Sequence, residues 1–328
     1  MKIFNTILIL GILFNAGCKV QNKTTMNDTT NPLLCDPQTG VCEVPETQTG
    51  TEFKASGSDK KPIKVIYYTD PICSSCWGIE PQLRKLKLEY GHILDIEYHM
   101  GGLLPDWSYN SGGISKPSDV AHHWDEVSLH YDMPIDGDVW LEDPLDSSYP
   151  PSIAFKAAEL QDHTKAILFL REMREMVFMQ KKNIAKWENM EEAARRAGLD
   201  IEVLKTDYEG KAVVMFNNDL KLGKELGVRG FPTMFFTDTT GQTEMVYGTR
   251  PYEVYEAAIL KLEPSADKYK YDKGWQSLFL KYSTLTAKEF AELSGIERTD
   301  AENQLKTLVE KGFLVSSSCK NGSMWRLK

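Results

Sequence analysis

The feature that most limits the fold of this chain is a pair of cysteines two residues apart, Cys73 and Cys76. An apolar run at residues 63–68 predicts a buried strand just before the pair, and residues 81–90 predict a helix after it. On a first helical turn, this spacing lets the two sulfurs bond without backbone movement. The arrangement therefore predicts a dithiol/disulfide redox site, with half a zinc site or a buried structural disulfide as alternatives.

Within this pair, Cys73 is predicted to be the attacking sulfur. It stands at the N-terminus of the predicted helix, where unpaired N–H groups and the positive end of the helix dipole favour a thiolate. We therefore expect Cys73 to be the more exposed sulfur with the lower pKa. Cys76 would then resolve the mixed disulfide that Cys73 forms.

A second signal lies about 155 residues downstream, where Phe231, Pro232 and Thr233 open an apolar strand pattern. Another strand pattern follows at residues 243–247. On its own, Pro232 is an ordinary proline at a strand start. Together with the cysteine motif, the segment resembles the thioredoxin superfamily, in which a cis proline faces the cysteine pair. The resemblance implies that Pro232 is that proline and that Phe231, Pro232 and Thr233 shape a substrate groove.

The stretch between these two signals is rich in helix patterns, at residues 153–179, 183–198 and 201–226. A helical insertion, here about residues 103–226, is typical of the DsbA family. Asp-Pro-Ile-Cys at residues 70–73 and Gly-Gly-Leu-Leu-Pro at residues 101–105 resemble its FrnE-like and SpxH-like subgroup. The resemblance implies an α/β, thioredoxin-like (DsbA-like) domain over residues 61–264, with protein disulfide oxidoreductase or isomerase activity and no cofactor or metal.

Two other functions compete with this interpretation. SpxH-like relatives serve as adaptors for a cytosolic protease, which would make the chain a non-catalytic docking protein. Glutathione-dependent isomerases share the fold but usually carry a serine in place of the redox pair, so Cys73 and Cys76 favour disulfide chemistry. Because Ser74 and Ser75 supply no cation, the direction of that chemistry stays open.

Aromatic residues near the motif offer further contacts for a substrate. Trp77 and Trp107 are candidates for apolar contact in the groove, with core packing as the alternative. The adjacent His122 and His123 have no ligand-spaced partner, and a helix surface is the simpler place for them.

The N-terminus predicts export. Residues 1–17 have a basic start, a short apolar core and small residues before Cys18, which is a signal-peptide pattern. The segment resembles a bacterial lipobox, although Asn15 stands where leucine is usual. The resemblance implies that Cys18 is acylated and that the protein is lipid-anchored in the cell envelope, facing the periplasm. Its partners would then be cysteine-containing exported proteins and a membrane or periplasmic redox partner.

Residues 18–60 are predicted to form a flexible tether, because they are polar and hold too few apolar residues to build a core. Within them, Cys35 and Cys42 flank an Asp-Pro and a Gly, so we expect a small loop closed by a disulfide. The pair is either structural or a second redox pair that exchanges with Cys73 and Cys76. A zinc site is disfavoured, because six residues separate the two cysteines.

The last segment, residues 270–328, is predicted to be a separate unit. Three helix patterns are followed by two short strands around Asn321-Gly322, an order that resembles a winged helix. Its 10 basic and 7 acidic residues do not provide the concentrated positive charge of a DNA-binding surface, so no nucleic-acid partner is expected. Cys319 lies in the predicted loop between these strands.

Overall fold

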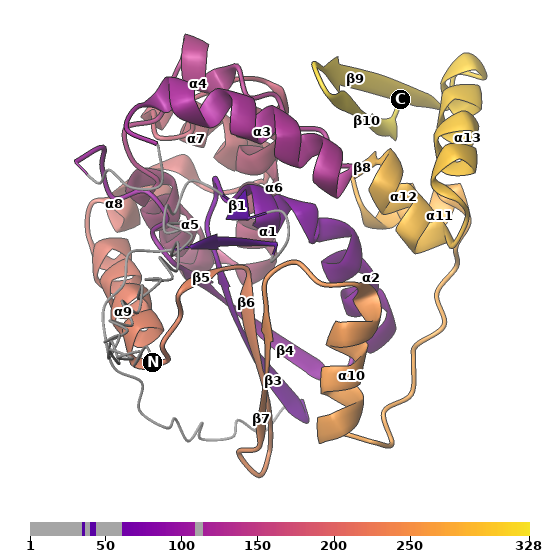
Figure 1. The fold of residues 1–328 in the computed structure, drawn as a ribbon, viewed down its shortest axis with the longest axis horizontal. Coiled ribbons are helices and arrows are strands. Elements are labelled where there is room, and N and C mark those ends of the chain that lie inside the picture. Colours follow the sequence, from indigo (N-terminus) through magenta and orange to yellow (C-terminus); the bar gives the residue numbers. More distant parts are fainter. Residues whose placement is uncertain (1–34, 37–39, 44–60, 109–113) are drawn as a thin grey trace, which may run out of the picture.

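The computed structural model describes residues 35–36, 40–43, 61–108 and 114–328, and a four-stranded mixed sheet lies at its centre (Figure 1). In spatial order its strands are β4 (Leu94–Met100), β3 (Ile63–Thr69), β6 (Thr233–Asp238) and β7 (Thr243–Tyr247). β3 runs parallel to β4, and the other two pairings are antiparallel. The predicted strands at residues 63–68 and 243–247 are confirmed.

The central strand is β3, in which every side chain except that of Lys64 is buried. Burial on both faces explains why its sequence is an almost continuous apolar run instead of an alternating pattern. The chain then enters α1 (Ser74–Gly78) and α2 (Glu80–Tyr90) before it returns in β4. The predicted order of strand, cysteine pair and helix is therefore confirmed.

A helical insertion separates β4 from the second half of the sheet. It contains α3 (Pro117–Tyr131), α4 (Val139–Glu142), α5 (Tyr149–Gln161), α6 (His163–Met179), α7 (Trp187–Arg196), α8 (Ile201–Tyr208) and α9 (Lys211–Glu225). The prediction of one helix over residues 153–179 is wrong. Asp162 is extended, with φ −164° and ψ 121°, and its side chain accepts from the N–H of Lys165, so a new helix begins there. The helix predicted over residues 201–226 is likewise interrupted, at Gly210.

The second half of the thioredoxin fold consists of β5 (Gly230–Phe231), β6, β7 and α10 (Tyr252–Leu262). The peptide bond between Phe231 and Pro232 is cis, as the resemblance implies for Pro232. Pro232 has no N–H to donate to a ladder. It separates β5, which pairs with β2, from β6, which pairs with β3 and β7.

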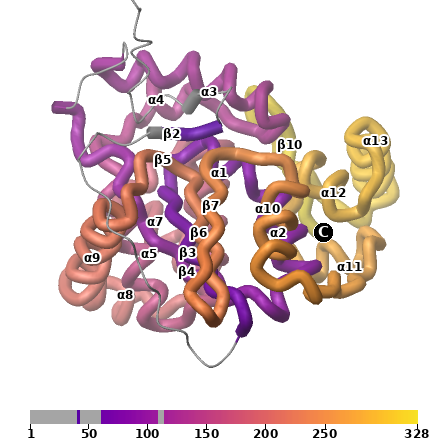
Figure 2. Tube along the Cα trace, turned by 60° about the horizontal axis from the view of Figure 1, so that its bottom comes forward, coloured from indigo at the N-terminus to yellow at the C-terminus, as the bar shows by residue number. Residues whose placement is uncertain are grey.

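The arm before the fold has more structure than the sequence predicts. β1 (Cys35–Asp36) pairs with β2 (Val41–Glu43), which in turn pairs antiparallel with β5. Val41 and Cys42 are fully buried, so the prediction that this segment only tethers the fold is wrong for these residues. Figure 2 shows β2 lying between α3 and β5. A short strand can dock there because the backbone edge of β5 is available for pairing.

The C-terminal segment contains α11 (Trp275–Lys281), β8 (Thr284–Thr286), α12 (Ala287–Ser294), α13 (Arg298–Glu310), β9 (Leu314–Cys319) and β10 (Gly322–Leu327). The three helices and the terminal hairpin occur in the predicted order, and β8 joins the hairpin in a sheet of order β8-β10-β9. A capping box of Thr286 and Glu289 starts α12. Apolar side chains of these elements form their own core, whose buried members include Leu278, Phe290, Leu305 and Trp325. Cys319 is the last residue of β9 and does not lie in the loop as predicted.

Candidate functional site

The cysteine pair lies where the sequence places it, at the start of the helix after β3. Cys73 is the N-cap of α1, and its sulfur accepts a hydrogen bond from the backbone N–H of Cys76 at 3.1 Å. Both cysteines are free thiols. This arrangement supplies two neighbouring sulfurs at a helix N-terminus, which is the requirement for dithiol chemistry.

The expected exposure and acidity of Cys73 are not found. Cys73 and Cys76 are both fully buried. Burial and the neighbouring Cys76 sulfur raise the pKa of Cys73 well above its usual value. Burial also acts to raise the pKa of Cys76, but the hydrogen bond with Cys73 and the charge of Arg174 lower it overall. The prediction that Cys73 has the lower pKa is therefore wrong for this arrangement, because it considers the helix terminus and not the cover above it.

The cover is the N-terminal arm. The sulfur of Cys42 lies 3.4 Å from that of Cys73 and 3.4 Å from the hydroxyl of Ser75. Cys42 is disulfide-bonded, and Cys35 is the residue opposite it in the β1–β2 ladder. The side chain of Cys35 lies outside the described residues, so the predicted pairing of Cys35 with Cys42 stays a prediction.

The segment around the cis bond between Phe231 and Pro232 also contacts the N-terminal arm. Cys42 is the ladder partner of Phe231, the residue that precedes the cis bond to Pro232. One short strand thus brings the sulfur of Cys42 to Cys73 and the Cys42 backbone to Phe231. The hydroxyl of Thr233 donates to the carbonyl of Gly230 at 2.7 Å, which links the residues on either side of Phe231 and Pro232.

Gly101 in the Gly-Gly-Leu-Leu-Pro motif is required by close packing against the same loop. A Cβ atom added at Gly101 would lie 1.7 Å from the ring of Phe231. Phe231 and Gly101 also line a shallow pocket with Tyr149 and Leu220. Gly101 of the motif therefore leaves room for the ring of Phe231, the residue before the cis proline. This packing explains why the Gly-Gly-Leu-Leu-Pro motif and the proline segment occur in the same chain.

A buried carboxyl group connects this motif with the cysteines. Asp70 is fully buried, and its two oxygens accept from the N–H groups of Ile72 and Leu103 and from the hydroxyl of Ser148. Burial raises the pKa of Asp70 to about 6, although these hydrogen bonds favour the charged form. The backbone carbonyl of Asp70 also accepts from the N–H of Cys73 at 3.2 Å.

Arg174 on α6 is a charged neighbour of the cysteine pair that sequence reasoning missed. Its guanidinium donates to the hydroxyl of Thr69 at 2.6 Å and to the carbonyl of Asp70 at 3.3 Å. Its other terminal nitrogen contacts Glu80 of α2 at 2.6 Å. The available signal was an arginine on the apolar side of a helix pattern, since such a charge is rarely buried unless it is paired.

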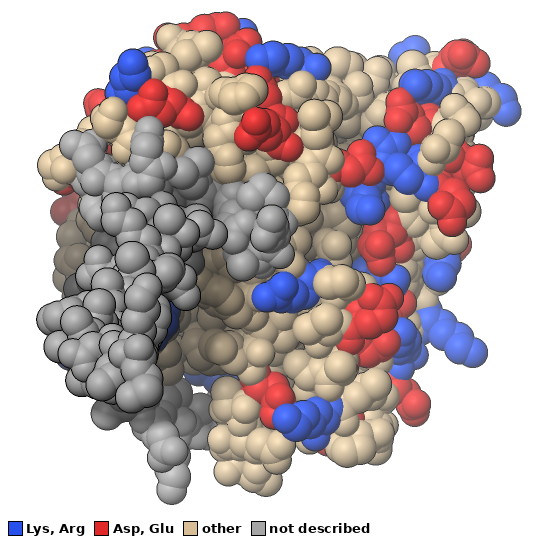
Figure 3. Space-filling view, in the orientation of Figure 1, with Lys and Arg blue, Asp and Glu red and all other residues tan. Residues whose placement is uncertain are grey.

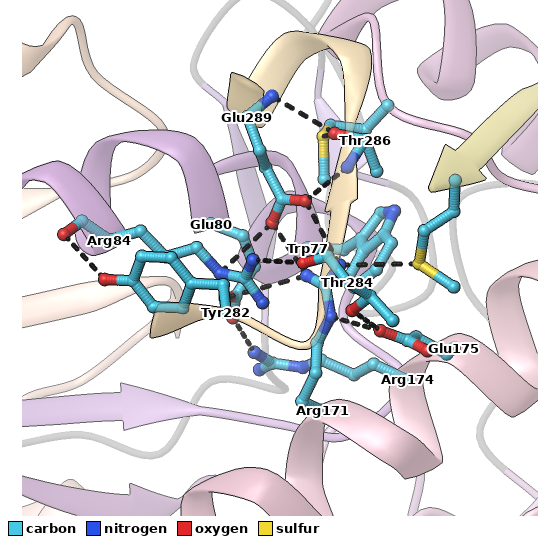
Figure 4. Close-up of polar contacts among 12 residues, drawn as sticks. Trp77, Glu80, Arg84, Arg171, Arg174, Glu175, Tyr282, Thr284, Thr286 and Glu289 are labelled. Atoms are coloured by element: carbon cyan, nitrogen blue, oxygen red, sulfur yellow. Dashed lines mark hydrogen bonds and ion pairs between the residues drawn. The ribbon is translucent and has the colours of Figure 1, made fainter. Parts of the chain in front are cut away.

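Charged side chains form further contacts that lead from Glu80 to the C-terminal unit, as Figure 4 shows. Arg171, one turn before Arg174, donates to both oxygens of Glu289 at 2.8 and 3.1 Å and to Glu175 at 2.6 Å. The N–H of Thr286 also donates to Glu289, which is fully buried. A continuous set of polar contacts therefore joins the cysteine site to the helix cap of α12.

Several candidate residues lie away from the sulfurs. Trp77 is fully buried, stacks on Phe178 and donates to the carbonyl of Pro134, so core packing is its role here and not the groove. Trp107 is half-buried and packs edge-on against Trp140. The side chain of His122 projects into solvent from α3, where it is 84% exposed.

Other predicted sites concern metals and the membrane. Within the described ranges, no cluster of His, Cys, Asp and Glu is arranged to hold a metal ion. Likewise, none of the helices in those ranges combines the length and apolar character of a membrane span. The predicted signal peptide and the acylation site Cys18 lie outside the described residues.

Comparison with known proteins agrees with this geometry. Residues 67–257 match the family model described as thioredoxin. The ClpXP adapter protein SpxH of Halalkalibacterium halodurans is 34% identical over 302 residues, which cover 90% of this chain and 97% of that protein. SpxH of Bacillus subtilis is 30% identical over 275 residues, with coverages of 82% and 91%.

Among solved structures, the cytosolic disulfide reductase DsbM of Pseudomonas aeruginosa has a TM-score of 0.50 and 23% identity. It corresponds to 61% of this chain and 99% of its own chain. This likeness shows the thioredoxin fold with its helical insertion.

Proposed function

Because this chain belongs to the thioredoxin family, together with the SpxH adapters, we propose that it is a partner-binding adapter built on a thioredoxin fold. It would hold a client protein and present it to a second protein, and its relatives are named ClpXP adapter proteins. The observation that carries the proposal is the extent of the similarity, which spans 90% of this chain in the comparison with the Halalkalibacterium halodurans protein. The solved disulfide reductase corresponds to only 61% of this chain.

The packing of the C-terminal unit supports the same proposal. Arg171 holds Glu289 through two hydrogen bonds, and Arg84 donates to the carbonyl of Thr284 at 2.8 Å. A second unit held through buried charged contacts moves with the thioredoxin fold, so that a client can contact both surfaces. Disulfide chemistry alone does not require such a unit.

The test is a measurement of protein lifetimes. After translation is blocked, a strain without the protein is compared with the wild type, and we expect one or a few client proteins to last several times longer. Re-expression of the full chain should restore the short lifetime, and so should the double variant Cys73→Ser, Cys76→Ser. Unchanged lifetimes across the proteome would contradict the adapter proposal. A requirement for both cysteines would favour the second candidate.

The second candidate function is thiol–disulfide exchange on cysteine-containing exported proteins, with a membrane or periplasmic redox partner. It is favoured by one observation, the pair of free thiols with a disulfide sulfur only 3.4 Å from Cys73. The Cys73 thiolate would attack a client disulfide, and Cys76 would then displace the client thiolate.

The reduction potential of the Cys73–Cys76 couple indicates the direction of that exchange. A value near about −120 mV marks an oxidant and one near about −270 mV a reductant. Measuring it in the double variant Cys35→Ser, Cys42→Ser isolates the site couple from the arm. If no disulfide forms between Cys73 and Cys76 at any potential, the exchange function is wrong.

A further inference from the structure

We propose that the disulfide of Cys42 is a built-in redox partner of the Cys73–Cys76 dithiol, held by β2 in the position of a bound substrate strand. This inference rests on the second function proposed above, exchange at Cys73, and deepens it by naming the first disulfide that the site meets. Sequence analysis leaves a structural and a redox role open for the arm cysteines, and the following contacts favour the redox role.

The first observation is the position of the sulfur. Cys42 Sγ lies 3.4 Å from Cys73 Sγ, and both residues are fully buried. Ser75 lies 3.4 Å from the same Cys42 sulfur, and its hydroxyl also forms a 2.7 Å hydrogen bond with Tyr131. A loop disulfide with a purely structural role has no reason to place its sulfur against the thiol of a dithiol motif 31 residues away.

The second observation is the backbone pairing of the arm. β2 runs antiparallel to β5, with Cys42 opposite Phe231 and Glu43 opposite Gly230. An extended peptide bound by strand addition uses the same free edge and gains its affinity from main-chain hydrogen bonds. The arm therefore occupies the edge on which an extended client segment would pair.

The third observation fixes the other end of β2. The carbonyl of Gly40 accepts from the N–H of Thr249 at 2.7 Å. Gly40 has φ +67°, and a Cβ atom there would lie 2.7 Å from the Cβ of Thr249. Only glycine allows this approach, so the chain carries a specific seat for the arm.

The exchange balances within the chain. The Cys73 thiolate attacks the Cys42 sulfur, which forms a Cys73–Cys42 bond and releases the partner cysteine, predicted to be Cys35, as a thiolate. The Cys76 thiolate then attacks Cys73 and releases Cys42. Two electrons pass from the site dithiol to the arm disulfide, and the arm ends as a dithiol while the site ends as a disulfide. No outside oxidant or reductant takes part in this step.

The test traps the intermediate in the full chain. In Cys76→Ser, the second step cannot occur, so the Cys73–Cys42 bond should accumulate. The protein, with its arm disulfide formed, is freed of oxidant, incubated and quenched with acid and an alkylating reagent, and its disulfides are mapped by mass spectrometry. We expect Cys42 linked to Cys73, with Cys35 alkylated, in most molecules. An arm disulfide that stays intact while Cys73 is alkylated would overturn the inference.

A matched pair of glycine variants tests the seating of the arm. Gly40→Ala in the Cys76→Ser background should slow formation of the Cys73–Cys42 bond at least tenfold. Gly241→Ala is the control, because Gly241 has φ +88° but open space around it, so it carries the strain without the collision. Equal rates in the two variants would contradict the proposed seat.

Glutathione disulfide distinguishes failure of the inference from failure of the exchange function. With Gly40→Ala the uncovered Cys73 should form a mixed disulfide with glutathione at least ten times faster than in the otherwise identical protein. If Cys73 reacts with glutathione disulfide but never with Cys42, the arm inference fails and the exchange function stands. If Cys73 reacts with neither, both fail.

Discussion

Arg171 donates one hydrogen bond to each carboxylate oxygen of Glu289, at 2.8 and 3.1 Å, across the junction between the thioredoxin fold and the C-terminal unit. Glu289 is fully buried and also accepts from the N–H of Thr286 at the start of α12. The same carboxylate thus caps a helix of one unit and pairs with an arginine of the other, so separating the two units would remove the contact between Glu289 and Arg171.

Glu289→Gln should therefore lower the free energy of unfolding by about 3 kcal/mol, the scale observed when one partner of a buried ion pair is removed. Glu292→Gln is the control, because Glu292 lies on the same helix and pairs with Lys85, but both side chains are more than a fifth exposed. The control should cost less than about 1 kcal/mol. Urea denaturation of both variants measures the difference, and equal losses would show that burial of this pair does not matter.

Asp70 predicts a pH dependence. Burial raises its pKa from 3.8 to about 6 in the folded protein, so the folded state holds a proton that the unfolded state has lost between these values. Stability should therefore fall as pH rises from about 4 to about 6, by about 3 kcal/mol at 1.36 kcal/mol per pKa unit. The comparison is with Asp70→Asn, which lacks the titration. Parallel stability curves for the two proteins over this range would contradict the shift.

Replacement of the site cysteines should separate their roles with an outside disulfide. Cys73→Ser abolishes exchange, because Cys73 forms the first bond, whereas Cys76→Ser stops at a mixed disulfide through Cys73. Gel analysis after alkylation shows the trapped species. Using the Cys35→Ser, Cys42→Ser background removes competition from the arm. Full dithiol activity in Cys73→Ser would assign the attack to another sulfur.

Membrane attachment is predicted to depend on Cys18. The mature protein should partition with membranes, and Cys18→Ala should release it or leave it unprocessed. Because one acyl chain binds membranes only marginally, stable attachment implies multiple acylation. Cell fractionation, with a serine replacement at Cys319 as the control, measures the effect. Wild-type protein recovered wholly from the cytosol would exclude the envelope location and, with it, the exported substrates of the second candidate function.

We predict that the full chain binds duplex DNA only weakly and without sequence preference. Figure 3 shows basic and acidic side chains mixed over the part of its visible face that carries the C-terminal unit. On α13 the positive charge of Arg298 is already paired with Asp132 at 2.7 Å and with Glu302 at 2.8 Å. Lys306, the other basic residue of α13, pairs with Glu302 at 2.7 Å, so this helix offers little free positive charge for phosphate contacts. Fluorescence anisotropy at physiological salt provides the measurement, and tight sequence-selective binding would contradict the prediction.

Local patterns predicted the parts of the site that depend on neighbouring residues. The start of α1 at Cys73 follows from residues within one or two turns of chain, and the capping box of Thr286 and Glu289 is an equally local signal of a helix start. The cis bond before Pro232 follows from the family resemblance, since nothing in the sequence around a proline specifies its isomer. The helix break at Asp162 was missed because apolar periodicity continues across it.

The cover and the charged contacts could not be predicted in the same way. β2 is three residues long, too short for an alternating pattern, and it is held by pairing with β5 far along the chain. The contacts of Arg174 likewise join residues more than 90 positions apart, to Thr69 and Glu80. A helix N-terminus can be recognised from sequence, but the segment that covers it cannot. The pKa of Cys73 was therefore predicted to be low, whereas burial raises it.

The burial of Val41 and Cys42 means that access to the dithiol is a property of the whole chain and not of the thioredoxin fold alone. A sealed sulfur reacts only when its cover opens, so the observed rate is the intrinsic rate multiplied by the fraction of time spent open. A protein shortened to begin at residue 61 lacks this gate. Its thiols would react at the intrinsic rate, and the ratio of the two rates would give the free energy that holds the arm in place.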